Sequence, residues 1–412
     1  MSAHAAGKPD ERGRTRVAIL GCGTVGREVA ARLIESGERL GLEVVKILVR
    51  DATRDRGLPR ALFTTEVHDV EAAAPEVVVE LIGGVEAAGP LAERFLGRGF
   101  SVVTANKTLI AHQGPTLAAL AAEHGAQIAY EASVCAAIPV IASLRHPAGD
   151  RVLSITGVVN GSCNFILSRL GEGWRFEDAL AEARKRGLVE PDPSADISGR
   201  DSAEKLCVLA AAVGVSLPPS RVETRGIESL TPEDLAAARR SGQSIKLIAE
   251  LDLSSDMVRA RVGPTLLPRL HPLAQAVEEE NAVAIETVLG GELFLRGRGA
   301  GPKPTASAVL GDVVRLAANR LGARPDARRD KPSAPMDSGW PSRRHTLRID
   351  GPRDPAEVLG AFRARGVEPE EISVSRDATR VLTGPLPPVL AAACAGAVGT
   401  GEPKGTLVLP VL

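Results

Sequence analysis

The sequence predicts an α/β protein with a doubly wound parallel sheet, followed by a second, α+β domain with a mixed sheet and a small terminal module. From Arg14 to about residue 130, strand-like apolar runs alternate with helix-like segments. This alternation is typical of a parallel sheet covered by helices on both faces. After about Pro139 the alternation stops, which marks the start of a different architecture.

The first sheet is predicted from five apolar runs. The expected strands are 17–20, 44–49, 77–81, 101–104 and 127–130, with helices reaching Glu35 and covering 90–98 and 110–123. Open parallel sheets bind ligands at the carboxyl ends of their strands. Those ends carry the unusual residues of the region, which are Gly21 to Gly26, Gly83-Gly84, Asn106-Lys107 and Glu131 to Val134. We therefore expect a site along that edge.

The remainder is predicted to form a second sheet, a linker and the terminal module. The expected strands are 152–159, 245–253, 258–262 and 282–289, and the expected helices are 164–170, 176–186, 199–213 and 305–321. Residues 322–342 are rich in Pro, Arg, Asp and Ser, as linkers are. Beyond them, Asp354 is expected to cap a helix that starts at Pro355, within a β-α-β-β-α-β order of ferredoxin-like type.

Composition narrows the functional classes. A chain of 412 residues suffices for two or three domains, and a net charge of -1 gives no reason to expect a nucleic-acid or membrane partner. No apolar run reaches the roughly 20 residues that span a bilayer. The polar tail Met1 to Arg16 lacks the apolar centre of a secretion signal. Five cysteines without metal-ligand spacing lie in apolar segments, as expected for buried thiols in the cytoplasm.

The segment Gly21-x-Gly23-x-x-Gly26 follows a predicted strand and opens a predicted helix. In a dinucleotide-binding, Rossmann-type fold, the first glycine allows a tight turn and the second lets the backbone approach the pyrophosphate. The third permits close packing of helix on strand. The backbone N–H groups of the helix start, with Thr24 and Val25, would then face the phosphates. A purely structural glycine turn is the alternative.

The second strand ends in Arg50-Asp51, two residues that favour different cofactors. An acidic residue here binds the ribose hydroxyls of NAD, whereas an arginine pairs with the 2′-phosphate of NADP. NADP is slightly favoured, because Arg50 comes first and Arg54 and Arg56 follow. A solvated loop cation is the alternative for Arg50.

Asp201 and Lys205 are spaced i, i+4 and therefore share one face of a predicted helix, which continues to apolar residues at Val208, Leu209 and Ala212. A lysine positioned in this way can exchange a proton with an alkoxide or an alcohol. An ordinary helix salt bridge, worth about 0.3–0.5 kcal/mol, is the alternative.

Other polar groups are candidates for holding a substrate. Glu190, Asp192 and Asp196 lie in a proline-rich loop before that helix and could bind an ammonium group, or form only an exposed acidic loop. Lys107 follows a strand end and is either a site residue or a surface cation. Asn160-Gly161-Ser162 could bind a carboxylate through N–H donors, or simply cap a helix.

Seven stretches together resemble homoserine dehydrogenases across about residues 15 to 320. In order they are GCGTVG at 21–26, ELIGG at 80–84, VVTANKTL at 102–109, YEASV at 130–134, NGSCNFIL at 160–167, EPDPSADISGRDSAEKL at 190–206 and RGAGPKPTASAVLGDVV at 298–314. The resemblance implies the reversible NAD(P)-dependent conversion of L-aspartate 4-semialdehyde to L-homoserine, on the route to threonine and methionine.

The resemblance also implies residue roles. Lys205 would give a proton to the aldehyde oxygen, and Lys107 would lie beside the nicotinamide and the substrate. The substrate would be bound by Asp201 and Glu190, with Asp196, Asn160, Gly161 and Ser162 as further candidates. The cofactor would contact the glycine loop, Arg50, Gly83, Lys107, Gly187, Glu190 and Gly301. A sodium ion would be held by the backbone carbonyls of Glu131, Val134, Ala136 and Ile138.

The domain organisation follows from the same resemblance. Residues 14–140 plus 302–321 would form the NAD(P)-binding domain, 141–301 the substrate-binding and dimerisation domain, 322–342 the linker and 343–412 an ACT-like regulatory domain. The second domain's sheet would make the contact in a homodimer or homotetramer. The terminal domain resembles an ACT domain in element order alone, so an amino-acid effector such as threonine and a merely structural role are both open.

Three positions depart from the family pattern. Cys135-Ala136-Ala137 replaces glycines, which puts the sodium site in doubt because side chains disfavour such a turn. Cys163 replaces a hydroxyl residue, and Gly187-Leu188-Val189 lacks the usual aromatic. These changes motivate a first alternative, a relative that acts on a different amino aldehyde. A second alternative is a non-catalytic NAD(P)-binding sensor.

Overall fold

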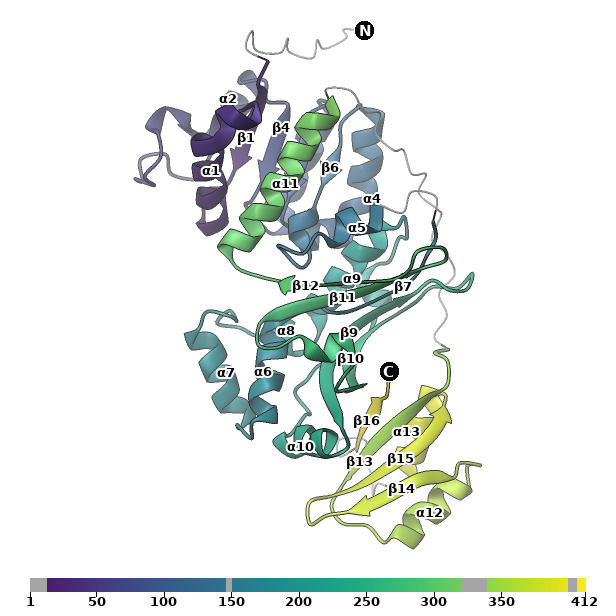
Figure 1. Ribbon diagram of the computed structural model, residues 1–412. Helices are drawn as coiled ribbons and strands as arrows, with labels where there is room; N and C mark the ends of the chain where they lie inside the picture. Colours follow the sequence, from purple (N-terminus) through teal and green to yellow (C-terminus); the bar gives the residue numbers. More distant parts are fainter. Residues whose placement is uncertain (1–12, 146–149, 321–338, 399–405) are drawn as a thin grey trace. The chain divides into compact units, whose positions relative to one another are not determined.

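The computed structural model describes the chain except for residues 1–12, 146–149, 321–338 and 399–405. The chain forms two compact units (Figure 1). The first contains Met1–Ile155, Ala203–Arg221 and Ile285–Ala334, and the second contains Thr156–Ser202, Val222–Ala284 and Pro335–Leu412. The predicted tail 1–16 and linker 322–342 fall largely outside the described residues. The predicted domain boundaries stay a prediction.

The first sheet has six strands in the order β3-β2-β1-β4-β5-β6, and each pair of neighbouring strands is parallel. The strands are β1 (Thr15–Leu20), β2 (Leu42–Leu48), β3 (Phe63–Thr64), β4 (Val77–Glu80), β5 (Ser101–Thr104) and β6 (Ile128–Ala129). The helices are α1 (Thr24–Leu40), α2 (Val67–Ala72), α3 (Val85–Leu96), α4 (Lys107–Glu123), α5 (Val140–Arg145) and α11 (Pro302–Arg320). This arrangement confirms the doubly wound sheet.

Helices cover both faces of this sheet because successive strand side chains point to opposite sides. On one face, Val17 and Ile19 of β1 pack in one apolar cluster with residues of α1 and α11. On the other face, Ala18 and Leu20 share a cluster with residues of α3 and α4. The strands are buried on both sides, as their continuous apolar runs predict. The late helix α11 therefore completes the first sheet's core (Figure 1).

The second sheet is mixed, with the order β12-β11-β7-β9-β10-β8. Its strands are β7 (Val152–Val158), β8 (Glu223–Thr224), β9 (Gln243–Asp252), β10 (Arg259–Pro268), β11 (Glu280–Thr287) and β12 (Gly291–Arg298). The pair β9–β10 is antiparallel and the pair β10–β8 is parallel. The helices of this region are α6 (Gly161–Gly171), α7 (Phe176–Lys185), α8 (Ser194–Ile197), α9 (Arg200–Ala212) and α10 (Pro232–Arg240). The mixed sheet is thus confirmed.

The C-terminal module is a four-stranded antiparallel sheet in the order β14-β15-β13-β16. Its elements are β13 (Arg343–Asp350), α12 (Pro355–Arg363), β14 (Pro369–Val374), β15 (Ala378–Leu386), α13 (Pro388–Val398) and β16 (Thr406–Pro410). One face carries the apolar core with α12 and α13. The Asp354 carboxylate accepts a hydrogen bond from Ala356 N, and Pro355 is the first helical residue, as predicted. The ferredoxin-like order is confirmed.

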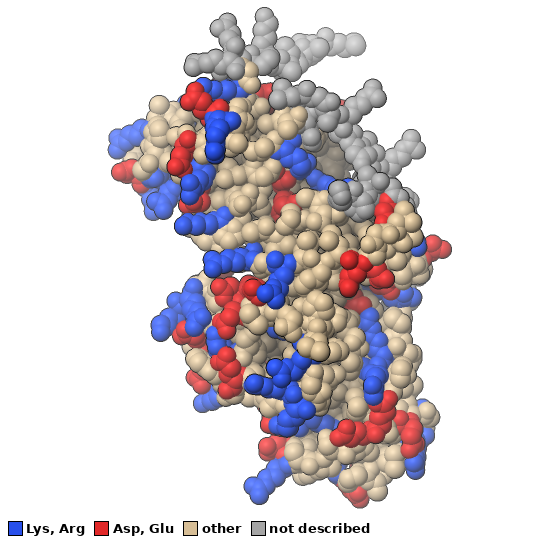
Figure 2. Space-filling model, viewed as in Figure 1, with Lys and Arg blue, Asp and Glu red and all other residues tan. Residues whose placement is uncertain are grey.

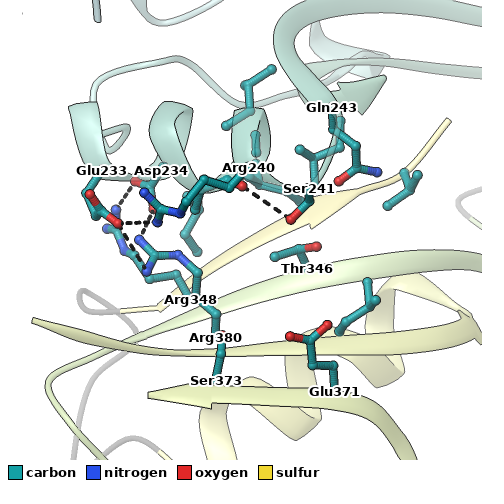
Figure 3. Close-up of a pocket in the computed structure, with 18 of the residues that line it drawn as sticks. Glu233, Asp234, Arg240, Ser241, Gln243, Thr346, Arg348, Glu371, Ser373 and Arg380 are labelled. Atoms are coloured by element: carbon teal, nitrogen blue, oxygen red, sulfur yellow. Dashed lines mark hydrogen bonds and ion pairs between the residues drawn. The ribbon is translucent and has the colours of Figure 1, made fainter. Parts of the chain in front are cut away.

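The open face of this small sheet is joined to helix α10 by an ion cluster (Figure 3). Asp234, only 4% exposed, accepts hydrogen bonds from the guanidinium groups of Arg348 and Arg380. Glu233 lies 3.9 Å from Arg380 and accepts a hydrogen bond of 2.7 Å from Arg240. The two elements border a cavity of about 620 Å³. Since each arginine meets a carboxylate, the cavity wall is close to electrically balanced.

Surface charge agrees with the near-zero net charge. Figure 2 shows basic and acidic side chains interspersed over the face that it draws. In the parts of the chain that the structure describes, none of the helices combines the length and apolar character needed to cross a bilayer.

Candidate active site

The glycine loop connects β1 to α1, and its three glycines meet three different surroundings. A Cβ at Gly21, whose φ is +96°, would lie 2.6 Å from the carbonyl oxygen of Leu81. A Cβ at Gly26 would lie 2.2 Å from the carbonyl oxygen of Gly21. A Cβ at Gly23, by contrast, would have no neighbour within 4 Å. Gly21 and Gly26 are therefore required for packing, whereas Gly23 leaves open space at the start of α1.

Gly83 lies at the carboxyl end of β4, where the buried carboxylate of Glu80 organises the turn. Glu80 accepts hydrogen bonds from Ile82 N at 2.7 Å, from Gly83 N at 3.0 Å and from the hydroxyl of Thr104 at 2.6 Å. Gly83 has a φ of +80°. Glu80 was not among the predicted site residues, although an acidic residue that ends a fully apolar strand is a signal of such a role.

Arg50 and Asp51 differ in how the protein uses them. Asp51 accepts hydrogen bonds from the backbone N–H and the hydroxyl of Thr53, at 2.8 and 2.6 Å, and these bonds lower the pKa of Asp51. Asp51 is thus engaged in its own turn. Arg50 is exposed at the end of the second strand.

Asn160 connects two of the predicted acidic residues. Its side-chain oxygen accepts a hydrogen bond from Cys163 N at 2.8 Å and so caps α6. Its Nδ2 donates to a carboxylate oxygen of Asp196 at 2.7 Å and to one of Asp201 at 2.8 Å. Asn160 is 3% exposed. Asn160 therefore caps α6, and the same side chain also fixes the orientation of the Asp196 and Asp201 carboxylates.

The neighbours of Asn160 hold the loop 187–199. The Ser162 hydroxyl donates to Leu188 O at 2.6 Å, and the Cys163 thiol donates to Asp196 O at 3.2 Å. The departure at Cys163 therefore keeps a hydrogen bond to this loop. The Asp192 carboxylate accepts a hydrogen bond of 3.0 Å from Ser194 N, at the first residue of α8, and this bond lowers the pKa of Asp192. Glu190 is exposed.

Helix α9 carries Asp201 and Lys205 one turn apart. Farther along the helix, Val208, Leu209 and Ala212 are buried, so the apolar end of the predicted face is confirmed. Asp201 and Lys205 themselves are intermediate in exposure. The pair is therefore held by a helix whose later turns are fixed in a core.

Lys107 lies beside this helix. Its ammonium group is 3.9 Å from a carboxylate oxygen of Glu204, the residue before Lys205, and Thr108 donates a hydrogen bond of 3.0 Å to the same carboxylate. Glu204 was not among the predicted site residues, because a glutamate inside a helix has no distinguishing sequence signal. It brings the start of α4 to α9.

The predicted residues are divided between the two compact units. The first unit contains the glycine loop, Arg50, Gly83, Lys107, the turn 131–138, Lys205 and Gly301. The second unit contains Asn160, Gly161, Ser162, Gly187, Glu190, Asp196 and Asp201. Gly301, with φ +110°, precedes α11, and its carbonyl oxygen accepts a hydrogen bond of 2.8 Å from the hydroxyl of Thr305.

The turn at 131–138 keeps an unusual backbone. Cys135 and Ala136 have φ values of +54° and +38°, in the left-handed region that favours glycine. The carboxylate of Glu131 accepts hydrogen bonds from Ile141 N and Ala142 N, and burial raises its pKa. Among the described residues, no group of three or more His, Cys, Asp or Glu side chains could hold a metal ion. An ion here would depend on backbone oxygens.

Two family models match the chain. The model described as homoserine dehydrogenase, NAD binding domain, covers residues 21–131, and the model described as homoserine dehydrogenase covers 139–314. A homoserine dehydrogenase of Corynebacterium glutamicum is 39% identical over 352 residues, which are 81% of this chain and 79% of that protein. The chain belongs to the homoserine dehydrogenase family. A homoserine dehydrogenase of Mycobacterium tuberculosis is 40% identical over 347 residues, 80% of this chain and 79% of that protein.

Solved structures agree. The crystal structure of a homoserine dehydrogenase from Thiobacillus denitrificans matches with a TM-score of 0.87 and 30% identity, over 97% of this chain and 98% of that one. A hyperthermophilic archaeal homoserine dehydrogenase in complex with NADPH matches with a TM-score of 0.65 and 30% identity, over 76% of this chain and all of that one.

Membership of the family settles the class of reaction. The chain is an NAD(P)-dependent oxidoreductase of amino-acid biosynthesis that interconverts L-aspartate 4-semialdehyde and L-homoserine. This result favours the predicted activity over both alternatives, the relative with a different aldehyde and the non-catalytic sensor. The two matched ranges end at residue 314, so the ACT-like assignment of the C-terminal module rests on its sheet topology.

Proposed function

We propose that Lys205 delivers the proton to the aldehyde oxygen while the nicotinamide cofactor delivers the hydride to the carbonyl carbon. The new C–H and O–H bonds turn the aldehyde into a primary alcohol. Negative charge grows on the oxygen as the C=O bond becomes a single bond, so a nearby ammonium group lowers the barrier. Lys205 and Lys107 are the cations that supply this charge. The confirmed burial of the later turns of α9 supports a fixed position for Lys205.

The cofactor's pyrophosphate would lie at the start of α1. The absence of any atom within 4 Å of a Cβ at Gly23 leaves room for a phosphate against the backbone. The first N–H groups of a helix have no intrahelical acceptor and favour an anion. Thr24, Val25 and Gly26 would present such groups, and Gly83, Gly187, Glu190 and Gly301 would complete the contacts.

NADP is the cofactor that we propose in preference to NAD. Asp51 is engaged by Thr53, whereas Arg50 is exposed and can reach a 2′-phosphate. The family relative solved with NADPH supports the same choice.

The substrate's ammonium group would be held by Asp201 and Asp196, with Glu190 nearby in sequence. Asn160 donates one hydrogen bond to each of the two aspartates, which fixes their orientation before a substrate arrives. Preorganised carboxylates bind a cation without a further ordering cost. The backbone at Gly161 and Ser162, at the start of α6, would receive the substrate carboxylate.

Several finer features belong to the same proposal. The domain boundaries are those predicted from the sequence, with the second sheet as the contact of a homodimer or homotetramer in the cytoplasm. A sodium ion would be held by the carbonyls of residues 131, 134, 136 and 138, and the left-handed backbone at Cys135 and Ala136 supports this because it retains a glycine-like path. An amino-acid effector such as threonine would act through the C-terminal module.

The decisive experiment follows NADPH absorbance with L-aspartate 4-semialdehyde for the wild type, Lys205→Ala and the control Lys185→Ala, whose side chain is 81% exposed. We expect Lys205→Ala to lower kcat by about 10²–10⁴-fold without changing NADPH affinity, and the control to behave as wild type. Full activity of Lys205→Ala would refute its role. Turnover confined to another aldehyde, or NADPH binding without turnover, would instead support the two alternatives.

A further inference from the structure

A second cavity lies outside the site described above. Its volume is about 410 Å³, and it is bordered by β8 and β10 on one side and by β13, α13 and β16 of the C-terminal module on the other. All of its lining residues belong to the second compact unit. Its polar wall contains Arg225, Arg261, Glu223 and His345. None of these residues was assigned a role in the reaction.

Arg225 differs from the three arginines labelled in Figure 3, which are Arg240, Arg348 and Arg380 and each of which contacts Glu233 or Asp234. Nη1 of Arg225 donates a hydrogen bond to the carbonyl oxygen of Val408 at 3.1 Å. Burial is the main cause that lowers the pKa of Arg225, and the positive charge of Arg348 lowers it further. A half-buried guanidinium in this state attracts an anion.

His345 supplies a second polar group in the same cavity. It is 1% exposed, and its Nδ1 has no hydrogen-bond partner among the described residues. Burial lowers the pKa of His345 to about 4, so the ring is neutral at physiological pH. A buried polar atom without a partner costs free energy, which a ligand that hydrogen-bonds to it would recover.

The other arginines on this side of the cavity are paired with carboxylates. Glu250, 5% exposed, accepts hydrogen bonds from both Arg261 and Arg343. The negative charge of Glu223, which also lines the cavity, favours the charged form of Arg261. Arg225 differs from Arg261 and Arg343 because its guanidinium donates to a carbonyl oxygen, which leaves it able to bind an oxygen anion.

The backbone beside Arg225 holds the turn that carries Asp196. Arg225 N donates to Val262 O at 2.8 Å, and Ile227 N donates to Ile197 O at 2.8 Å. Between them, a Cβ at Gly226 would lie 2.2 Å from the same oxygen of Ile197. Because these contacts join residues 225–227 directly to the 196–199 turn, we expect a displacement of the first segment to shift the second, which carries a carboxylate bound by Asn160.

We propose that this cavity binds a small anion, a carboxylate or a phosphate, between Arg225 and His345, and that its occupant adjusts the substrate-binding turn through Gly226. The second part rests on the proposed substrate role of Asp196. The shared ligand chemistry is an oxygen anion that accepts from the guanidinium and hydrogen-bonds to the imidazole. A volume of about 410 Å³ admits a metabolite-sized ligand of this kind.

Binding can be measured without turnover. Trp174→Phe leaves Trp340 as the one tryptophan, and the Arg261 guanidinium lies 4.5 Å from its ring centroid. In this background, inorganic phosphate and succinate are titrated, with sodium chloride as an ionic-strength control. We expect at least one of the two anions to give a saturable fluorescence change that chloride does not give. The same change in a Lys205→Ala enzyme separates this proposal from the catalytic one.

Two pairs of variants locate the response. Arg225→Gln removes the charge, and Arg239→Gln, at an exposed position outside the cavity lining, is its control. Ala392→Phe fills the cavity from an exposed position of α13 without removing a hydrogen bond, and Ala393→Phe is its control. The first member of each pair should weaken binding at least about tenfold, and the controls should not. If Arg225→Gln does not fold, the affinity of Ala392→Phe for the anion tests the site.

The turn is tested by kinetics. Saturating anion should change KM for the semialdehyde by about fivefold in the wild type and not in Ala392→Phe. The proposed anion site would be refuted if phosphate and succinate changed the fluorescence of the wild type only as chloride does, or if both cavity variants bound the anions with unchanged affinity. Saturable binding with an unchanged KM would overturn the link to Asp196.

Discussion

Two glycines of the cofactor loop have different roles: Gly26 is needed for folding and Gly23 for binding the cofactor. Gly26→Ala places a methyl group 2.2 Å from the carbonyl oxygen of Gly21, whereas Gly23→Ala places one where nothing lies within 4 Å. Gly23 has φ -77° and ψ -156°, an extended conformation that alanine adopts. The same substitution three residues apart is therefore expected to give opposite results in stability and in cofactor affinity.

The magnitudes follow from the contacts. Real Cβ contacts are essentially never shorter than 3.0 Å, so Gly26→Ala forces α1 and the Gly21 backbone apart. Such overpacking costs about 1–3 kcal/mol, which lowers the melting temperature by roughly 2–12 °C. Gly23→Ala should change stability by less than about 0.5 kcal/mol. Its methyl group occupies the space left for the pyrophosphate, so NADPH affinity should fall at least about tenfold, or 1.4 kcal/mol.

Both quantities are measured on the same samples, stability by thermal unfolding followed by circular dichroism and affinity by NADPH fluorescence titration. The wild type and Gly57→Ala serve as references, because Gly57 also has open space but lies outside the loop. Gly57 has a φ of +67°, so that control also shows what backbone strain alone costs. Unchanged NADPH affinity in Gly23→Ala, or wild-type stability in Gly26→Ala, would refute the reasoning.

Three further results are expected. Asp234→Asn removes the negative charge that binds Arg348 and Arg380, and it should destabilise the second unit by about 3 kcal/mol. The stability is measured by unfolding in guanidinium chloride, followed by tryptophan fluorescence, and an unchanged midpoint denaturant concentration would contradict this prediction. His345 has a pKa of about 4 instead of 6.5, so the unfolded state takes up its proton first. The free energy of unfolding should therefore keep the full contribution of His345 above pH 6.5 and fall by about 3 kcal/mol as the pH is lowered towards 4. In His345→Gln the free energy of unfolding should fall less steeply over the same range. Arg50→Ala should raise KM for NADPH about tenfold and leave KM for NADH unchanged, and equal effects on both cofactors would exclude contact with the 2′-phosphate.

The sequence predicted the elements whose burial is periodic. All five apolar runs of the first sheet are strands, since a strand buried on both faces must be apolar throughout. Strand β12 was missed because most of its residues are exposed, which leaves no apolar pattern. Strand β10 was predicted to end at Val262 but continues to Pro268. Beyond Val262 the short strand β8 no longer pairs with β10, so Pro264 lies where the edge is open and tolerates a residue without an N–H group.

Helix boundaries were predicted less well. The helix expected at 164–170 begins three residues earlier because Asn160 caps it, and α4 likewise begins directly after Asn106. Helix α10 was not predicted, although Thr231 and Asp234 form a capping box that the sequence contains. In each case the signal was a single polar residue whose side chain turns back to the backbone, and hydrophobic periodicity does not detect it.

Site residues fall into two groups for the same reason. The residues whose role depends on local geometry could be predicted, because local geometry gives a recognisable sequence pattern. Examples are the glycine at position 21, which has a positive φ, and the pair Asp201 and Lys205, which lie one helical turn apart. Glu204 acts through a partner on another helix, and no local pattern distinguishes it from a surface acid. Glu80 ends an apolar strand, which is a local signal, but its bond to Thr104 on the neighbouring strand cannot be read from the sequence.

Arg225 and His345 make the same point for the second cavity. Arg225 lies in a loop and His345 in strand β13, and their significance comes from their hydrogen-bond partners: the Arg225 guanidinium donates to a carbonyl oxygen, and Nδ1 of His345 has no partner among the described residues. The partner of an arginine is known only from the structure, because an arginine in a sequence with 51 acidic residues always has candidate carboxylates. Sites that depend on long-range partners therefore require a structure, whereas sites built from backbone geometry can be predicted from the chain alone.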